Sequence, residues 1–199
     1  MSTETNRRQY RKRRRAELEE ETRLRITEAT MHLHEEVGPA RTTVSAIAER
    51  AGVQRATVYR HFPDDYALIG ACSSHWNSLN PPPDLERWAG IEDPDRRLRA
   101  ALEELYDWYE GREQILSLLH RDRPSVPALD EHMGALDGYF VAAKETLARG
   151  RVERGARRRR VRAAIAHGLE FETWRSLARR ERLSRAEAVE LIAAMVAGA

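Results

Sequence analysis

The side chains best suited to binding chemistry lie in one short run in the first third of the chain. Residues 54–61 read Gln-Arg-Ala-Thr-Val-Tyr-Arg-His. On a helix, Val58 shares a face with Phe62 and points inward, so the polar groups of the run flank that face or point outward. Arginine can bond a guanine edge through two donors, and hydroxyl and imidazole groups suit phosphate oxygens. This run therefore predicts contact with double-stranded nucleic acid.

Two short helices joined by a turn are expected to position these side chains. Thr42-Thr43 fits the start of the first helix, because a threonine hydroxyl can cap free backbone N–H groups. Gly52 suits the left-handed residue that ends it. The second helix would cover residues 54–61, which completes a helix-turn-helix. The apolar positions of the first helix follow the i, i+3, i+4, i+7 pattern: Val44, Ile47, Ala48 and Ala51.

The rest of the chain also has helical patterning, and no stretch alternates as a strand would. The sequence therefore predicts an all-α protein. Asp64 and Asp93 are expected helix caps, and Ser184 with Glu187 forms a capping box. We expect an arm at 1–15, a helix-turn-helix domain at 16–63 and a second helical domain at 64–199. The helices are expected at about 14–37, 42–51, 54–61, 64–77, from 94 onward, 113–121, 128–150, 156–181 and 184–197.

Charge is distributed unevenly along the 199 residues, although the net charge is only +2. Residues 1–62 carry 13 Lys and Arg against 9 Asp and Glu, and residues 1–15 alone carry seven basic residues against Glu4. We expect residues 1–15 to form a basic, flexible arm that helps to bind a polyanion. The Arg157–Arg160 run is interpreted as a solvated helix start. With no signal peptide or apolar span in view, we expect a cytoplasmic protein.

The run from Thr42 to Phe62, together with Ala29, Gly38 and Leu68-Ile69, resembles the DNA-binding domain of the tetracycline-repressor (TetR) family. The resemblance extends over roughly residues 20–70 and is weaker beyond. It implies a bacterial regulator of transcription, most simply a repressor, that binds a palindromic operator as a homodimer and is released by a small molecule. The resemblance also implies that the protein is associated with the nucleoid when it is bound to DNA. The resemblance also implies DNA contacts at Thr43, Gln54, Arg55, Thr57, Tyr59 and His61, and we add the outward-facing Arg60.

Two positions depart from the family pattern. Gln54 stands where a short capping residue is usual, and glutamine caps poorly. Asp65 stands where the family commonly has a lysine that contacts phosphate, and a carboxylate would repel the DNA backbone. We therefore infer that one phosphate anchor is missing, and that the basic arm replaces it.

The C-terminal part is expected to hold an effector site and a dimer interface. Aromatic side chains with a few polar groups often line pockets between helices. Our candidates for the effector site are Trp108, His120, Tyr139, Phe140, His167, Glu170 and Phe171. For a four-helix dimer interface built by residues 156–181 and 184–197, we expect Phe171, Trp174, Leu177, Leu191, Ile192 and Met195.

Other classes of function find less support in the sequence. No nucleophile with its base, phosphate loop or cofactor signature is readable, so we expect neither an enzyme nor a cofactor. Cys72 and His75 share a helix face, but a lone cysteine is more often packing than a metal or redox site. Two alternatives stay open: a DNA-binding or architectural protein without an effector, and a helical enzyme with a vestigial helix-turn-helix.

Overall fold

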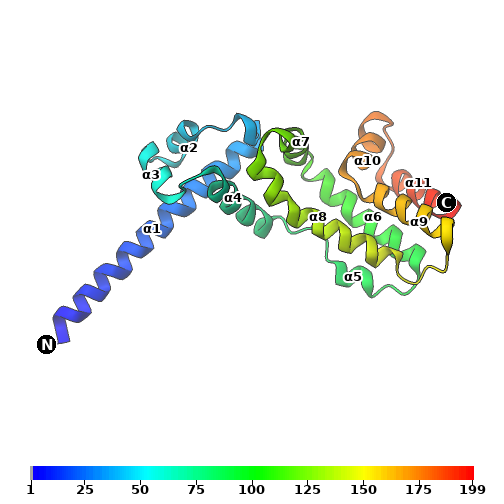
Figure 1. The fold of residues 1–199 in the computed structure, drawn as a ribbon, viewed down its shortest axis with the longest axis horizontal. Helices are drawn as coiled ribbons and strands as arrows, with labels where there is room; N and C mark the ends of the chain where they lie inside the picture. Colours follow the sequence, from blue (N-terminus) through cyan, green and yellow to red (C-terminus); the bar gives the residue numbers. More distant parts are fainter. Residues whose placement is uncertain (1) are drawn as a thin grey trace. The chain divides into compact units, whose positions relative to one another are not determined.

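A computed structural model describes the backbone of residues 2–199 and the side chains of residues 7–134 and 136–199. This part of the chain is built from helices and contains no β-strand (Figure 1). The helices are α1 (Ser2–Val37), α2 (Val44–Ala51), α3 (Arg55–His61), α4 (Asp65–Leu79), α5 (Leu85–Ala89), α6 (Pro94–Glu110), α7 (Glu113–Asp122), α8 (Pro127–Ala148), α9 (Gly155–Leu169), α10 (Phe171–Arg175) and α11 (Arg185–Gly198). Short 3-10 turns cover Pro39–Arg41 (η1) and Arg123–Ser125 (η2), and a π-helical turn covers Ser176–Arg180 (η3).

The chain forms two compact units. Unit 1 contains residues 1–80 and 117–132, and unit 2 contains residues 81–116 and 133–199. Helix α4 therefore belongs to the same unit as the helix-turn-helix, together with the end of α7 and the start of α8. This division differs from the boundary at residue 63 that the sequence suggested.

Unit 1 is held together by one apolar core between α1, α2, α3 and α4. Burial of each of the larger apolar side chains stabilises the folded state by roughly 1.5–3 kcal/mol. This packing fixes the angles between the four helices. The buried members are Ile26, Ala29, Leu33, Ile47, Ala48, Ala51, Val58, Phe62 and Leu68.

Unit 2 is organised around α6, which contacts α5, α9, α10 and α11. Helix α9 ends at Leu169, although the sequence suggested one continuous helix over 156–181. Two buried tyrosines give the reason. The Tyr106 hydroxyl donates to the Gly168 carbonyl at 2.9 Å, and the Tyr109 hydroxyl donates to the Leu169 carbonyl at 2.5 Å. These bonds satisfy carbonyls that would otherwise need a further helical turn, so the chain can leave the helix at Glu170.

The N-terminal residues also differ from expectation. The sequence suggested a flexible arm over residues 1–15, whereas α1 begins at Ser2 and runs without interruption to Val37. Neither glycine nor proline interrupts this stretch, and ion pairs one turn apart join Arg13 to Glu17 and Arg15 to Glu19. Local helix propensity therefore extends the first helix through the basic segment.

Candidate nucleic-acid interface

The turn between α2 and α3 sets the angle at which α3 leaves the core. The Thr43 hydroxyl accepts a hydrogen bond from the Ala46 N–H at 3.2 Å and so caps α2. At the other end Gly52 adopts a left-handed conformation with φ 64°. Its N–H donates to the Glu49 carbonyl, and the next N–H, that of Val53, donates to the Ala48 carbonyl. This pair of bonds is a Schellman motif, which ends α2 with a sharp change of direction.

Helix α3 is fixed on its inner side by apolar packing and by one arginine. Val58 and Phe62 are almost completely buried. Arg23, from α1, donates to the His61 carbonyl at 3.0 Å, and its guanidinium lies 4.3 Å from the centre of the Phe62 ring. A cation at the carbonyl end of a helix is favourable, because that end carries partial negative charge. The sequence offered no signal for the role of Arg23, since it acts across 38 residues.

The opposite side of α3 presents the polar side chains to solvent. Arg55, Tyr59 and Arg60 are exposed, with Tyr59 at 49% of its full accessibility, while Thr57 is half-buried. His61 is also half-buried, and burial, Arg60 and Arg23 together lower its pKa, so the ring is neutral at pH 7. A seven-residue helix with such a face fits the width of the major groove.

The two departures from the family pattern have distinct local structures. The side chain of Gln54 makes no capping hydrogen bond at the start of α3 and is exposed, so its amide is available to a ligand. Asp65 lies exposed in the first turn of α4. The preceding Asp64 is the cap, as expected, and accepts from the Ala67 N–H at 2.8 Å.

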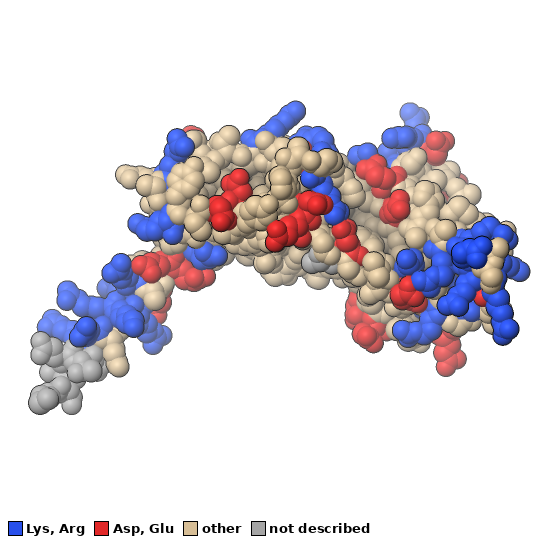
Figure 2. Space-filling model, in the orientation of Figure 1, with Lys and Arg blue, Asp and Glu red and all other residues tan. Residues whose placement is uncertain are grey.

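Basic side chains gather along the N-terminal part of α1 (Figure 2). The residues from Arg7 to Arg15 are all exposed. Two of the arginines pair with glutamates one turn later in the helix, which leaves a surplus of positive charge in the first turns. Such a charged helix suits the phosphate backbone of DNA, where charge rather than shape sets affinity.

A further contact to this domain was missed by sequence reasoning. The Asp122 carboxylate, at the end of α7, accepts from the Ala40 N–H at 3.0 Å, and the neighbouring Arg121 donates to the Val37 carbonyl at 2.9 Å. Gly38 has φ 89°, and a Cβ at this position would collide with the Asp122 carboxylate. The segment 117–132 thus holds the turn that joins α1 to α2. The only sequence signal was Gly38, because the partner lies about 80 residues away.

Comparison with known proteins identifies this architecture. Residues 26–72 match the family model described as "Bacterial regulatory proteins, tetR family". The chain is 30% identical over 142 residues to a protein of Mycobacterium tuberculosis named as an uncharacterized HTH-type transcriptional regulator, found in strains CDC 1551 / Oshkosh and H37Rv. That match covers 68% of this chain and 71% of the relative. The chain belongs to the TetR family.

Solved structures share the fold along most of this TetR-family chain. A tetR-family transcriptional regulator from Streptomyces coelicolor has 22% sequence identity and a TM-score of 0.57, over 89% of this chain and 78% of that protein. The transcriptional regulator FadR from Bacillus subtilis, solved in complex with stearoyl-CoA, has 18% identity and a TM-score of 0.57, over 87% and 95% of the two chains. The family model and the M. tuberculosis relative show that this TetR-family protein is a transcriptional regulator with a helix-turn-helix DNA-binding domain.

The structure brings only part of the expected effector site together. Phe171 lies in a cluster around Tyr109, which its ring centre approaches to 5.4 Å, and the Phe140 ring lies 6.4 Å from Tyr109. Trp108 is buried beside Tyr109, and Tyr139 stacks edge-on against Phe140. These rings pack on one another and form part of the core of unit 2.

The polar candidates for the effector site lie elsewhere. The side chains of His167 and Glu170 are 59% and 64% exposed and face each other across 4.0 Å. His120 lies in the segment 117–132, which belongs to unit 1. The expected single cluster of aromatic and polar residues is therefore corrected. In unit 2 Trp108 and Phe171 are buried and Tyr139 and Phe140 are half-buried, whereas this histidine and glutamate are on the surface.

The expected dimer contacts also divide into two groups. Phe171, Trp174 and Ile192 are at most 3% exposed within a single chain. Ile192 fills the space beside Gly168, where an added Cβ would lie only 2.5 Å from its Cγ2 atom. These residues form the core between α9, α10 and α11, so they are not exposed contacts for a second copy. The apolar candidates outside the core are Leu177, Leu191 and Met195.

The surroundings of Cys72 in unit 1 fit a packing role. Cys72 is buried, its Sγ lies 3.5 Å from the Nδ1 of His34, and burial raises its pKa to about 12, which keeps it a thiol. Among the described residues no group of three or more His, Cys, Asp or Glu side chains is arranged to hold a metal. No helix in the described part of the chain has both the length and the apolar character needed to cross a membrane.

Proposed function

We propose that this protein is a repressor that binds a palindromic operator as a homodimer. The observation that carries the proposal is the exposed polar face of α3 above a well-packed inner face. In this account Arg55 and Gln54 contact base edges, while Thr43, Thr57 and the remaining polar residues of α3 (Tyr59, Arg60 and His61) contact phosphates. The two recognition helices of the dimer would lie about 34–36 Å apart, one turn of DNA.

We place the dimer interface on the exposed side of α11. Leu191 is 49% exposed and Met195 is 38% exposed, which is unusual for large apolar side chains one helical turn apart. The variant Leu191→Glu/Met195→Glu should be monomeric and should lose operator affinity. Val141→Glu is the control, because Val141 is also an exposed apolar residue of unit 2, at 59% exposure, and lies on α8. A dimer that survives the double substitution in sedimentation analysis would exclude this interface.

We further infer that a small molecule releases the protein from its operator. The support is the stearoyl-CoA complex of the B. subtilis regulator, whose fold this chain shares over 87% of its length. Helices α7 and α8 each contribute residues to both units, and their shared segment 117–132 holds the turn before α2 through Asp122. A ligand that shifts either helix would therefore alter the position of α2 and α3. The difference in its affinity for the two conformations sets how far the equilibrium between them moves.

Titration of a duplex that the protein selects from genomic fragments tests these statements together. The complex should contain two chains per duplex, and one member of a panel of acyl-CoA thioesters and other apolar ligands should reduce affinity about 5- to 150-fold. One chain per duplex would exclude the dimeric operator. An operator affinity that no compound changes would favour the alternative of a regulator without an effector.

A further inference from the structure

A second concentration of positive charge lies in unit 2, far along the sequence from the helix-turn-helix. Residues 149–162 contain eight arginines and one glutamate. They form the connection between α8 and α9 and the first two turns of α9. Figure 2 shows basic side chains crowded over this end of unit 2. None of these arginines belongs to α1 or to the helix-turn-helix.

The arginines of this segment differ in whether an acid neutralises them. Arg151 forms an ion pair with Asp95 at 3.0 Å, and Arg162 pairs with Glu145. In contrast, no carboxylate among the described residues lies within ion-pair distance of Arg149, Arg154 or Arg158. These three guanidinium groups are exposed to solvent and have no partner at ion-pair distance, although Arg158 also acts on Glu145 at longer range, so they are available to bind an anion.

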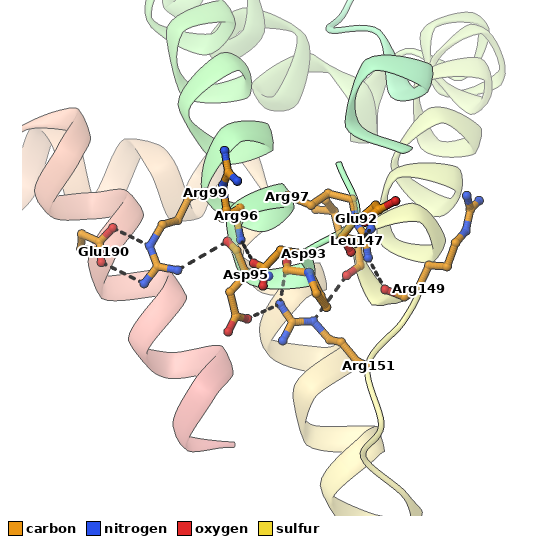
Figure 3. A network of polar contacts seen from close by, with 11 residues as sticks. Glu92, Asp93, Asp95, Arg96, Arg97, Arg99, Leu147, Arg149, Arg151 and Glu190 are labelled. Carbon is orange, nitrogen blue, oxygen red and sulfur yellow. Dashed lines mark hydrogen bonds and ion pairs between the residues drawn. The ribbon is translucent and has the colours of Figure 1, made fainter. Parts of the chain in front are cut away.

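The backbone beneath these groups is held firmly. Arg97 is only 3% exposed and donates to the Ile91 carbonyl at 2.6 Å and to the Arg149 carbonyl. Arg151 donates to the Pro94 carbonyl at 3.0 Å. In Figure 3 the guanidinium of Arg149 extends away from this network, although its carbonyl takes part in it. Burial is the main reason that the pKa of Arg97 is lowered; the charges of Arg149 and Arg151 lower it further, and Asp93 opposes the shift.

The same connection borders an open hollow of about 420 Å³ on the surface of unit 2. This volume lies within the range of small-molecule sites, roughly 300–1,000 Å³. Its lining includes Arg149, Arg154, Arg158 and Glu153. The Glu153 side chain is half-buried, and its carboxylate can accept a hydrogen bond from a ligand hydroxyl or amino group.

We propose that this hollow binds a small phosphorylated molecule that also carries hydroxyl groups, of the nucleotide or sugar-phosphate class. Arg149, Arg154 and Arg158 bind its phosphates, because a guanidinium fork matches phosphate oxygens in pairs. Glu153 accepts a hydrogen bond from its hydroxyl group. The limited volume of the hollow and the carboxylate of Glu153 within it favour a small ligand over a nucleic-acid strand, whose phosphates a carboxylate would repel.

Calorimetric titration of the full chain at about 0.15 M salt tests this proposal, with ADP, pyrophosphate and adenosine as probes. ADP is expected to bind most tightly, pyrophosphate more weakly, and adenosine not at all. Arg154→Gln/Arg158→Gln should weaken ADP binding about tenfold or more, since it removes two charge-assisted hydrogen-bonding groups. The matched control is Arg159→Gln/Arg160→Gln, which removes the same charge from exposed neighbours outside the lining and should change affinity less than about twofold.

The alternatives have distinct outcomes. Equal weakening of ADP binding in both double variants would mean diffuse surface charge and would overturn the proposal. Failure of ADP and pyrophosphate to bind the unmodified chain would do the same. If random-sequence duplex DNA displaces ADP and its own binding falls in Arg154→Gln/Arg158→Gln, the surface is a second nucleic-acid site instead. Operator binding should be unchanged in all these variants, so the proposal fails or stands independently of the repressor account.

Discussion

The carboxylate of Asp122 accepts a hydrogen bond from the backbone N–H of Ala40 at 3.0 Å, across 82 residues of sequence. This bond joins the end of α7 to the short turn η1 between α1 and α2. The carboxylate is only 4% exposed and is paired with Arg121 at 2.6 Å. A buried, charged acceptor at the entry to the helix-turn-helix makes the orientation of α2 depend on a segment that comes from the other half of the chain.

Replacing Asp122 should therefore destabilise unit 1. We expect Asp122→Asn to lower the free energy of unfolding by about 1–3 kcal/mol, because the Ala40 donor and Arg121 lose a charged acceptor. The Arg121 guanidinium and the Ala40 N–H lower the pKa of Asp122. Its stabilisation is therefore complete above the ordinary carboxyl pKa, about 3.9, and is lost as the pH falls below that value. Urea unfolding between pH 3 and 7 measures both effects. Asp130→Asn, at an exposed residue of the same segment, should leave stability within about 0.5 kcal/mol.

His34 predicts a pH dependence in a different range. Burial lowers its pKa to about 4, and the nearby Asp122 opposes this shift only partly. Between pH 6.5 and 4 the unfolded chain takes up a proton that the folded chain does not. Stability from this residue is therefore fully present above pH 6.5 and falls by up to about 3 kcal/mol as the pH drops toward 4.

Unfolding curves at pH 7.5, 6 and 5 check this prediction. In His34→Gln the loss of stability over this range should be much smaller than in the unmodified protein, whatever the variant's absolute stability. His32→Gln is the matched control on the same helix, with an exposed side chain, and should keep the full slope. An unchanged slope in His34→Gln would show that another group is responsible.

Arg23 should affect DNA binding without touching DNA. Arg23→Ala removes the hydrogen bond to the His61 carbonyl and the guanidinium over Phe62, so we expect a loss of about 1–2 kcal/mol in stability. Amide hydrogen exchange in α3 should accelerate, and operator affinity should fall. Arg25→Ala removes an exposed arginine from a different face of α1 and should change neither stability nor exchange in α3. Equal exchange in both variants would mean that apolar packing alone fixes α3.

The basic start of α1 should set the salt dependence of binding. Replacing Arg7, Arg8, Arg11 and Lys12 by glutamine should weaken binding to all sequences alike. The slope of log K against log salt should flatten by about 0.9 for each DNA phosphate that the variant no longer neutralises. Glutamine at each position from Arg157 to Arg160 removes the same charge from unit 2 and should leave the slope unchanged. Equal slopes in the unmodified protein and the α1 variant would exclude a role for this helix in DNA binding.

Local sequence signals predicted the helix-turn-helix well. Thr43, Gly52, Asp64 and Ser184 cap or end their helices as expected, because capping depends on residues within one turn. The end of α9 at Leu169 could not be predicted in this way, because it rests on hydroxyl groups some 60 residues away in sequence.

The candidate dimer contacts and the residues that support the helix-turn-helix depend on contacts between distant parts of the chain, which local sequence patterns do not reveal. Apolar periodicity marks Phe171 and Trp174 as buried, but it does not distinguish the core of one chain from an interface between two. The contacts of Arg23 and Asp122 likewise join residues far apart in sequence, so no local pattern points to them. The family resemblance located the recognition helix, whereas these supporting contacts required the folded structure.

The central claim is sequence-specific binding through α3, and selection of genomic fragments by the purified protein at about 0.15 M salt tests it most directly. We predict enrichment of a two-fold symmetric site whose half-sites lie about 10–10.5 base pairs apart. With Arg55→Ala, preference should be lost at one position in each half-site, at a cost of about 1–3 kcal/mol. Recovery of fragments without a shared sequence, or the same preferences in Arg55→Ala, would contradict the account.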